Sequence, residues 1–171
     1  PETSSGLGLV STDGARTWET LSAEWPIAGP AYAVGEGFVV ASPRGLALGL
    51  DTQSSVIPYV LESPLSSLAY THPMVAVGAG VGGGLYRTDN GGDSWSPVAG
   101  TAGMLFKGVA SPGAHAVVAI GDGFGWRSED AGRSWTMVAG FSECQPTWLR
   151  FHGQTGLIKC EAGEIMKSSD G

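Results

Sequence analysis

A short turn-forming stretch recurs along this chain at a nearly constant interval, and that interval constrains the fold. The complete copy is SEDAGRSW, at residues 128–135. A second copy, TDNGGDSW at 88–95, lies 40 residues upstream, and SSDG at 168–171 begins the pattern again 40 residues downstream. A further copy, STDGARTW, occupies residues 11–18. A repeat period of about 40 residues indicates a propeller or a solenoid.

Each copy combines residue types that suit a tight turn at the end of a strand. Asp and Asn hydrogen-bond to their own backbone two residues on and tolerate the left-handed region. The Gly that follows supplies a positive φ at little cost, and the Ser or Thr hydroxyl bonds a further backbone group. We therefore assign these turns a structural role rather than a ligand-binding or catalytic one. The residues concerned are Ser11, Asp13, Trp18, Thr88, Asn90, Gly92, Trp95, Ser128, Asp130, Gly132, Trp135, Ser168 and Asp170.

A tryptophan ends three of the copies, and its position predicts how neighbouring units pack. Trp18, Trp95 and Trp135 would each open the strand that follows the turn. A ring of this size buries a large apolar area, and its N–H is free to find a hydrogen-bond partner. We expect all three rings to be largely buried between units, because one repeat cannot bury its apolar face alone.

Two parts of the repeat pattern are degraded. In the first copy, Ala15 stands where the Gly is expected. The interval between the first two clear copies is about two periods, and GLALGLDTQSSV, starting at Gly45, aligns in the gap. There Asp51 falls near the acidic position and Ser55 matches the Ser, but Val56 replaces the Trp.

The unit over residues 104–140 shows the internal pattern most clearly. MLFKGVAS, AVVAIGD, GFGWRSED and SWTMVAG are four short strand-like runs separated by turn residues. Phe124, Trp126 and Ser128 alternate on one face of the third run. Four strands every 40 residues predict an all-β fold in which each unit is a four-stranded antiparallel blade of a β-propeller. The single domain, residues 1–171, divides into blade segments 1–22, 23–62, 63–100, 101–140 and 141–171.

The eight-residue pattern resembles the Asp-box, or BNR repeat, of sialidases, xyloglucan-hydrolysing glycoside hydrolases, sortilin-type receptors and the photosystem II assembly factor. The copy at 128–135 matches this motif fully, and those at 11–18 and 88–95 depart from it at one position each. The resemblance implies a β-propeller in which these turns lie on the peripheral hairpin of each blade, away from the usual binding face. It implies no particular function, because one fold hosts many functions.

The strands at the two ends predict the shape of the array. The first segment supplies two strands, GLGLVST and TWETLSA, and the last supplies three. Both ends carry the strand that precedes the turn, so they do not complement each other in one blade. We therefore expect a partial propeller, an arc of about four blades. A closed four-bladed ring, in which the two ends pair, and a solenoid are the alternatives.

Charge and composition exclude several classes of partner. The 171-residue chain carries a formal net charge of −7, and its nine Lys and Arg residues never cluster. Nucleic-acid binding requires a basic surface, so we expect no such partner. No run of 18 apolar residues occurs, so the chain is not expected to span a membrane. Residue 1 is Pro, which indicates a processed or trimmed N-terminus.

Cys144 and Cys160 lie in one repeat, at a separation that suits a disulfide across a pair of strands. Two buried free thiols are the alternative. A disulfide would place the protein in an extracytoplasmic compartment, periplasmic or secreted.

The inter-blade loops and the middle hairpins form the candidate binding face. The residues there are Glu24, Trp25, Arg44, Asp122, Glu143 and Glu161. Two opposed carboxylates are the minimum for most glycoside hydrolysis. The Arg-Ile-Pro motif typical of sialidases does not occur, and of six Arg residues only Arg44 and Arg150 lie away from the repeated turns. Solvated loop carboxylates are the simpler interpretation.

We expect no metal and no cofactor. His72, His115 and His152 occupy equivalent turns in three units. Equivalent positions of neighbouring blades lie too far apart to share a zinc ion. The Gly-rich run at 78–84 lacks the helix and the Lys of a phosphate-binding loop.

The sequence therefore favours a non-catalytic, extracytoplasmic scaffold or protein-binding module, such as a subunit or assembly factor of a larger complex. We expect a protein partner, or the remainder of the propeller, to contact it. The alternative is a fragment of a secreted carbohydrate-active enzyme or lectin, sialidase-like or xyloglucanase-like. That alternative implies a carbohydrate ligand and, for an enzyme, glycoside hydrolase activity.

Overall fold

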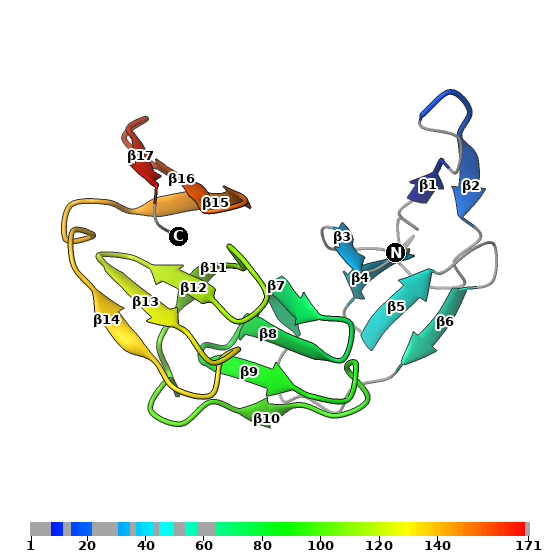
Figure 1. The fold of residues 1–171 in the computed structure, drawn as a ribbon, viewed down its shortest axis with the longest axis horizontal. Coiled ribbons are helices and arrows are strands. Elements are labelled where there is room, and N and C mark those ends of the chain that lie inside the picture. Colours follow the sequence, from blue (N-terminus) through cyan, green and yellow to red (C-terminus); the bar gives the residue numbers. More distant parts are fainter. Residues whose placement is uncertain are drawn as a thin grey trace, which may run out of the picture.

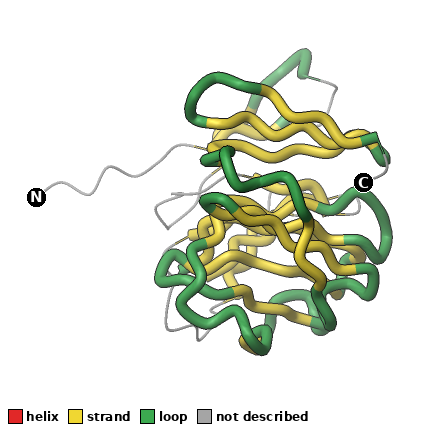
Figure 2. Tube along the Cα trace, turned by 90° about the vertical axis from the view of Figure 1, so that its left-hand side faces the viewer, coloured by secondary structure: helices red, strands yellow, loops and turns green. Residues whose placement is uncertain are grey.

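A computed structural model describes residues 8–11, 15–21, 31–34, 37–42, 45–49, 54–57 and 64–169, with side chains at 11, 15–18 and 64–169. All regular elements in this part of the chain are β-strands, and Figure 2 shows only strands and loops there. The same residues contain no helix that is long and apolar enough to cross a membrane. The predicted all-β fold is confirmed.

The described residues form five antiparallel sheets that follow one another along the chain. The first holds β1 (Gly8–Val10) and β2 (Glu19–Leu21), and the second holds β3 (Ala31–Val34), β4 (Gly37–Ser42), β5 (Gly45–Gly49) and β6 (Ser54–Ile57). The third holds β7 (Leu65–His72), β8 (Val75–Gly80), β9 (Leu85–Thr88) and β10 (Ser96–Pro97). The fourth holds β11 (Phe106–Ala110), β12 (Val117–Gly121), β13 (Phe124–Ser128) and β14 (Thr136–Val138). The fifth holds β15 (Pro146–His152), β16 (Thr155–Cys160) and β17 (Ile165–Ser168).

Each sheet is a meander, because every strand in it pairs with its neighbour in the sequence. The register is the same in neighbouring sheets. Val77 on β8 pairs with Arg87 on β9, and Val118 on β12 pairs with Arg127 on β13. Residues at equivalent positions of the repeat therefore occupy equivalent places in space, which allows one sheet to be compared directly with the next.

The five sheets form an open arc. The first strand of each sheet lies innermost, where β3 contacts β7, β7 contacts β11 and β11 contacts β15. Figure 1 shows the sheets β1–β2 and β15–β17 at the two ends of the arc, apart from each other. The expected partial propeller is confirmed, and the alternative of a closed four-bladed ring does not form.

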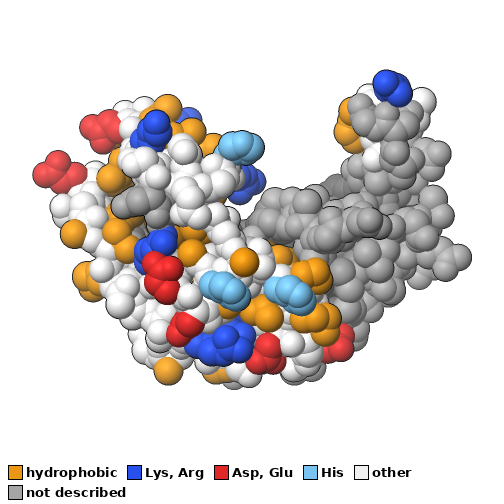
Figure 3. Space-filling model, in the orientation of Figure 1, with side chains coloured by type: hydrophobic (Ala, Val, Ile, Leu, Met, Phe, Trp, Pro, Cys, Tyr) orange, Lys and Arg blue, Asp and Glu red, His pale blue; other side chains and the backbone are white. Residues whose placement is uncertain are grey.

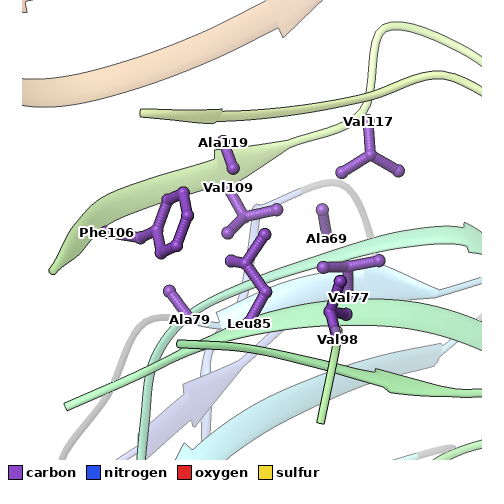
Figure 4. Packing of buried hydrophobic residues seen from close by; sticks show 9 residues of the cluster. All are labelled: Ala69, Val77, Ala79, Leu85, Val98, Phe106, Val109, Val117 and Ala119. Atoms are coloured by element: carbon purple, nitrogen blue, oxygen red, sulfur yellow. The ribbon is translucent and has the colours of Figure 1, made fainter. Parts of the chain in front are cut away.

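The sheets β7–β10 and β11–β14 pack face to face, and we call this contact the central interface. Figure 4 shows its core, which consists of Ala69, Val77, Ala79, Leu85, Val98, Phe106, Val109, Val117 and Ala119. Most of these side chains are small, and Phe106 is the one aromatic ring among them. Phe106 stands edge-on to Phe124 and Trp126, with ring centroids 5.3 and 6.3 Å away. Removing this apolar area from water is the main stabilising term.

The sheets β11–β14 and β15–β17 meet at a second contact, the C-terminal interface. Its core consists of Val118, Ile120, Phe141, Cys144, Leu149, Ile158 and Cys160. Strand β12 contributes to both interfaces, because Val117 and Ala119 join the central core while Val118 and Ile120 join the C-terminal core. This burial on both faces explains why β12 is a continuous apolar run rather than an alternating one.

The burial of the turn tryptophans differs from the prediction. Trp18 is 57% exposed, so the expectation that it is largely buried between units is wrong. It leads into the two-stranded sheet at one end of the arc, and two strands offer little surface for a large ring to cover. Trp95 and Trp135 are half-buried, and Trp135 packs against the core of the central interface.

Several predicted positions lie outside the described residues. These are Asp13, Glu24, Trp25, Arg44, Asp51 and Asp170, together with the side chains of Ser55 and Val56.

Candidate functional site

The complete copy of the repeated turn is held by its own side chains. The hydroxyl of Ser128 accepts the N–H of Gly132 (2.8 Å) and donates to Oδ1 of Asp130 (2.8 Å). Asp130 also accepts the backbone N–H of Arg133 (2.9 Å) and both the N–H (2.8 Å) and the hydroxyl (2.6 Å) of Ser134. These hydrogen bonds, those from Ser134 above all, lower the pKa of Asp130. The carboxylate therefore serves as the acceptor that organises the turn.

The turn at 88–95 repeats this arrangement with an amide. The hydroxyl of Thr88 accepts the N–H of Gly92 (3.0 Å) and donates to Oδ1 of Asn90 (2.8 Å). Oδ1 of Asn90 accepts the N–H of Ser94 (3.0 Å), while Nδ2 donates to the Ser94 hydroxyl (2.8 Å). Asn thus donates to the serine side chain where Asp accepts from it. Either residue completes the turn.

The first copy keeps part of this geometry despite its altered sequence. Ser11 Oγ accepts the N–H of Ala15 (2.8 Å), the bond that Ser128 makes with Gly132. Ala15 has a φ of 68°, close to the 85° of Gly132. A side chain in the left-handed region is unfavourable compared with Gly. The complete copy carries a cost of the same kind one position earlier in its turn, at Ala131, whose φ is 58°.

The turn of the sheet β11–β14 is also joined to the sheet β7–β10. Arg87 on β9 donates from Nε to the carbonyl of Ala131 (2.8 Å). A Cβ atom added to Gly132 would overlap a methyl group of Val77, so this close approach requires glycine. Trp135 donates from Nε1 to the carbonyl of Gly132 (3.1 Å), and its ring packs on the core of the central interface. The turn is therefore part of the contact between two sheets.

Each repeated turn lies beside the first hairpin of its own sheet. The N–H of Gly91 donates to the carbonyl of Met74 (2.9 Å), and that of Ala131 donates to the carbonyl of His115 (2.6 Å). Figure 3 shows the histidines, in pale blue, as separate side chains that are not in contact with one another. Within the described residues, no three His, Cys, Asp or Glu side chains come close enough together to hold a metal ion.

The other end of the sheets carries the middle hairpins and the connections between sheets, and we call it the loop end. Backbone hydrogen bonds join its parts. The N–H of Gly84 donates to the carbonyl of Met104 (2.8 Å), and the N–H of Gly123 donates to the carbonyl of Cys144 (3.2 Å). Each bond ties the middle hairpin of one sheet to the connection that leads into the next. The loop end is therefore braced across sheet boundaries.

Two large apolar side chains are exposed at the loop end. Val81, between β8 and β9, is 60% exposed, and Leu105, directly before β11, is 59% exposed. Lys107 and the predicted binding residue Asp122 form an ion pair there, with 3.3 Å between Nζ and Oδ2. Both charged side chains are 49% exposed, so this pair adds little stability.

The predicted disulfide is confirmed. Cys144 and Cys160 are bonded, with Cα atoms 5.3 Å apart. Cys144 lies in the connection that precedes β15, and Cys160 is the last residue of β16. The bond therefore fixes the incoming connection to its own sheet, and both residues are buried in the core of the C-terminal interface.

Of the predicted binding residues, the structure brings Glu143 and Glu161 together. Both line a cleft of about 380 Å³ beside the disulfide, which also includes Gln145. The N–H of Glu161 donates to the carbonyl of Gln145 (2.8 Å), so the two sides of the cleft are linked through the backbone. Asp122 does not line this cleft, because its hairpin belongs to the preceding sheet.

A larger cleft, of about 560 Å³, was not predicted from the sequence. It lies between the sheets β11–β14 and β15–β17, and its lining includes Val118, Arg127, Val138, Phe151 and Met166. No motif marks these residues, since they come from separate strands. This cleft could be predicted from the sequence only by comparing equivalent positions in neighbouring repeats.

No known protein family matches this sequence, and no curated protein does so either. Solved structures do match. YCF48 from Cyanidioschyzon merolae superposes with a TM-score of 0.70 and 17% identity, over 97% of this chain and 64% of that chain. YCF48 bound to D1 peptide gives a TM-score of 0.70 and 14% identity, over 96% and 58%. The GH74 enzyme of Niastella koreensis gives 0.61 and 18%, over 84% and 22%.

These similarities concern the fold, because the sequence identities are low. The chain spans less than two thirds of the length of these two YCF48 chains. The meander sheets, their shared register and their arrangement in an arc agree with these comparisons. In fold, therefore, the chain is a β-propeller arc that is similar to YCF48 and to the GH74 enzyme.

Proposed function

We propose that this chain is a non-catalytic, protein-binding propeller scaffold whose binding surface is the loop end. The observation that carries the proposal is the pair of exposed side chains Val81 and Leu105, which lie on hairpins and connections that backbone hydrogen bonds brace together. Exposed apolar side chains with a charged rim are typical of protein-binding surfaces. A braced surface also loses less conformational entropy on binding than separate loops would.

The charges around this surface indicate the kind of partner. In the described part of the loop end, Lys107 is outnumbered by four carboxylates, those of Asp122, Glu143, Glu161 and Glu164. Complementary charge steers association and excludes wrong partners. The partner segment is therefore expected to combine apolar side chains with Lys or Arg. The similarity in fold to YCF48 bound to D1 peptide supports a peptide segment as the ligand.

The repeated turns and the disulfide support the two remaining parts of the proposal. The turns combine the Ser-x-Asp-x-Gly-x-Ser-Trp pattern with the hydrogen bonds of Ser128 and Asp130, and we propose that they are Asp-boxes. Disulfides persist in oxidising compartments, so the Cys144–Cys160 bond supports an extracytoplasmic location, periplasmic or secreted.

Selection of a displayed peptide library against the immobilised 171-residue chain tests the binding function. We expect the selected peptides to be apolar and basic. A double variant, Val81→Ser with Leu105→Ser, should then bind them at least about tenfold more weakly, because each buried apolar side chain contributes about 1.5–3 kcal/mol. The control is Met137→Ser on β14, an apolar residue away from the loop end that is 74% exposed. Equal losses in both variants, or no selected peptide, would contradict the proposal.

A second candidate function is carbohydrate binding or hydrolysis. The cleft that holds Glu143 and Glu161 favours it, since paired carboxylates bind or cleave sugars in many proteins. The similarity in fold to a GH74 enzyme supports the same candidate. A glycan array and a glycoside hydrolase screen test it. Binding or activity that disappears in the Glu143→Gln with Glu161→Gln variant, but not in the loop-end double variant, would favour this function over protein binding.

A further inference from the structure

The turn at 88–95 contains the one asparagine of the chain, Asn90, and Gly91 follows it directly. An Asn-Gly pair deamidates readily, because glycine has no Cβ to shield its backbone nitrogen from the asparagine side chain. In the complete turn, the equivalent position holds Asp130, which is the residue type that deamidation produces. The turn therefore combines a reactive pair with a product that a neighbouring repeat already contains.

The reaction joins the side chain of Asn90 to the backbone of Gly91. The nitrogen of Gly91 loses its proton and attacks Cγ of Asn90, the bond from Cγ to Nδ2 breaks, and ammonia leaves. The cyclic succinimide that results then takes up a water molecule. Cleavage of the bond from the ring nitrogen to Cγ gives aspartate. Cleavage on the other side of that nitrogen gives isoaspartate, in which the main chain runs through the side-chain carbons.

The structure holds the attacking group on both sides. The N–H of Gly91 donates to the carbonyl of Met74 (2.9 Å), which lies between β7 and β8. The carbonyl of Gly91 accepts the hydroxyl of Tyr70 on β7 (3.3 Å). Attack by the nitrogen requires that it lose its proton, and with it the hydrogen bond to Met74. The first hairpin of the sheet therefore restrains the nucleophile.

The side chain of Asn90 is held as well. Its Oδ1 accepts the hydroxyl of Thr88 (2.8 Å) and the N–H of Ser94 (3.0 Å). Its Nδ2 donates to the hydroxyl of Ser94 (2.8 Å). Rotation of the amide toward Gly91 would break these bonds. The closed turn therefore protects Asn90, and the reaction proceeds from an opened turn.

Aspartate at position 90 fits the closed turn. In the turn at 128–135, Oδ1 of Asp130 accepts the N–H of Ser134 (2.8 Å), and Oδ2 accepts the hydroxyl of Ser134 (2.6 Å). The hydroxyl of Ser94 accepts a hydrogen bond from the amide, and it can rotate to donate to a carboxylate in the same place. The aspartate product therefore keeps the full set of hydrogen bonds.

Isoaspartate at position 90 does not fit. The hydroxyl of Thr88 accepts the N–H of Gly92 (3.0 Å), and this bond closes the turn over a separation of four residues. An additional main-chain carbon inside that span moves Gly92 out of register with Thr88. The two products therefore differ in whether the turn re-forms.

We propose that Asn90 is a deamidation site whose reactivity is controlled by opening of its turn, and that the aspartate product re-forms the turn. The reaction replaces an amide by a carboxylate, so the formal net charge of −7 becomes more negative by one. The turn lies at the opposite end of the sheets from the loop end. The site therefore does not depend on the proposed function.

Incubation of the full chain in mildly alkaline buffer, with and without guanidinium chloride at one temperature, tests the control by folding. Peptide mapping by mass spectrometry locates the replacement of NH₂ by OH, and chromatographic retention separates aspartate from isoaspartate. We expect Asn90 to react at least about tenfold more slowly in the folded chain. Equal rates in the two states, or no reaction in the denatured chain, would overturn the proposal.

Two matched variants separate opening of this turn from a general change in the sheet. Tyr70→Phe removes the hydroxyl that bonds Gly91 and should raise the rate in the folded chain at least about threefold. Tyr86→Phe makes the same change on β9, where the ring lies beside Gly80 at the loop end, and should leave the rate unchanged. Both should react like the unmodified chain in guanidinium chloride. Equal rates in the two folded variants would contradict control by the turn.

The Asn90→Asp variant tests the product. It should have a urea midpoint close to that of the unmodified chain, with the N–H groups of Gly92 and Ser94 still protected from hydrogen exchange. Chain that carries isoaspartate, purified from the denatured incubation and refolded, should lose this protection. A much lower midpoint for Asn90→Asp, or equal protection in the isoaspartate chain, would refute the assignment of the products.

Discussion

The central and C-terminal interfaces join similar sheets by different means. At the central interface, apolar residues fill the inner part, and Trp135 with its turn closes the outer part. At the C-terminal interface, the inner part is equally apolar, but a disulfide fixes the connection and the outer part is a cleft. The inner packing is therefore similar at the two interfaces, and their outer parts differ. The turn serves to seal the periphery and to bond one sheet to the next.

The loop ends of the two interfaces differ as well. Thr101 is buried in the connection between β10 and β11, where its hydroxyl accepts the N–H of Leu85 (2.9 Å) and donates to the carbonyl of Val98 (2.8 Å). The next connection, between β14 and β15, carries the disulfide instead. A hydrogen-bonded hydroxyl and a covalent bond thus hold successive connections, and their removal should have effects of different size.

Loss of the disulfide is the largest expected effect. A Cys144→Ala with Cys160→Ala variant should unfold with a free energy about 3 kcal/mol lower, because the bond closes a loop with a sequence separation of 16. Urea denaturation measures this loss, and the unmodified chain in reducing agent is the control. Hydrogen exchange should show lost protection in β15–β17 and retained protection in β7–β9. Equal losses in both sheets would remove the distinction between the interfaces.

The next effect concerns the turn tryptophans. Trp135→Ala should lower the free energy of unfolding by about 2 kcal/mol, below the 3–5 kcal/mol of a fully buried ring, because Trp135 is half-buried. Trp18→Ala should change it by less than about 0.5 kcal/mol, since that ring is 57% exposed. Urea midpoints of the two variants give the comparison. Similar losses would mean that the first turn is packed as tightly as the complete one.

Thr101→Val should lower the free energy of unfolding by about 1–2 kcal/mol. The change leaves the N–H of Leu85 and the carbonyl of Val98 without this partner in a buried place. The control is Thr147→Val, where an exposed hydroxyl donates to the carbonyl of Lys159 (3.2 Å) and water can replace it. Thermal unfolding of the pair measures the difference, and a neutral Thr101→Val would show that this connection needs no buried hydrogen bond.

The smallest expected change in stability distinguishes the turn built on Asp130 from the turn built on Asn90. Asp130→Asn should cost less than about 1 kcal/mol at pH 7, because Asn90 completes the equivalent turn. Hydrogen bonds hold the pKa of Asp130 below its unfolded value of about 3.9. Its carboxylate therefore stabilises the fold above about pH 4, and this contribution is lost as the pH falls further. Urea midpoints between pH 5 and 2 should fall less steeply in the variant, and parallel curves would contradict the assignment.

The repeat period was sufficient to predict the sheets, since it recorded the number of strands and the turns between them. The disulfide followed from two cysteines in one repeat, and the hydrogen bonds of Ser128 and Gly132 followed from turn chemistry. These features are local in sequence. Residue types within one repeat determine these features, and contacts with other sheets contribute little to them.

Features that depend on neighbouring sheets were harder to predict. The motif at Trp18 matches that at Trp135 in its last residue, but burial depends on how many strands surround the ring. The large cleft involves Val118 and Arg127, which resemble their counterparts Val77 and Arg87 in sequence and in register. What differs is the segment placed against them. The sequence pattern predicts the strands and turns within one repeat well, but it predicts the packing between neighbouring sheets poorly.

The meander arrangement has a consequence for the order in which the chain folds. Every described strand pair joins neighbours in the sequence, so each sheet can close its backbone bonds over a short span without waiting for distant parts. Folding can therefore start in any sheet and spread through the interfaces, as in other repeat proteins. Unfolding should run the other way, with an end sheet detaching before the centre opens. Strands β8 and β12, which lie in the middle of their meanders, should be the last to exchange their amide hydrogens.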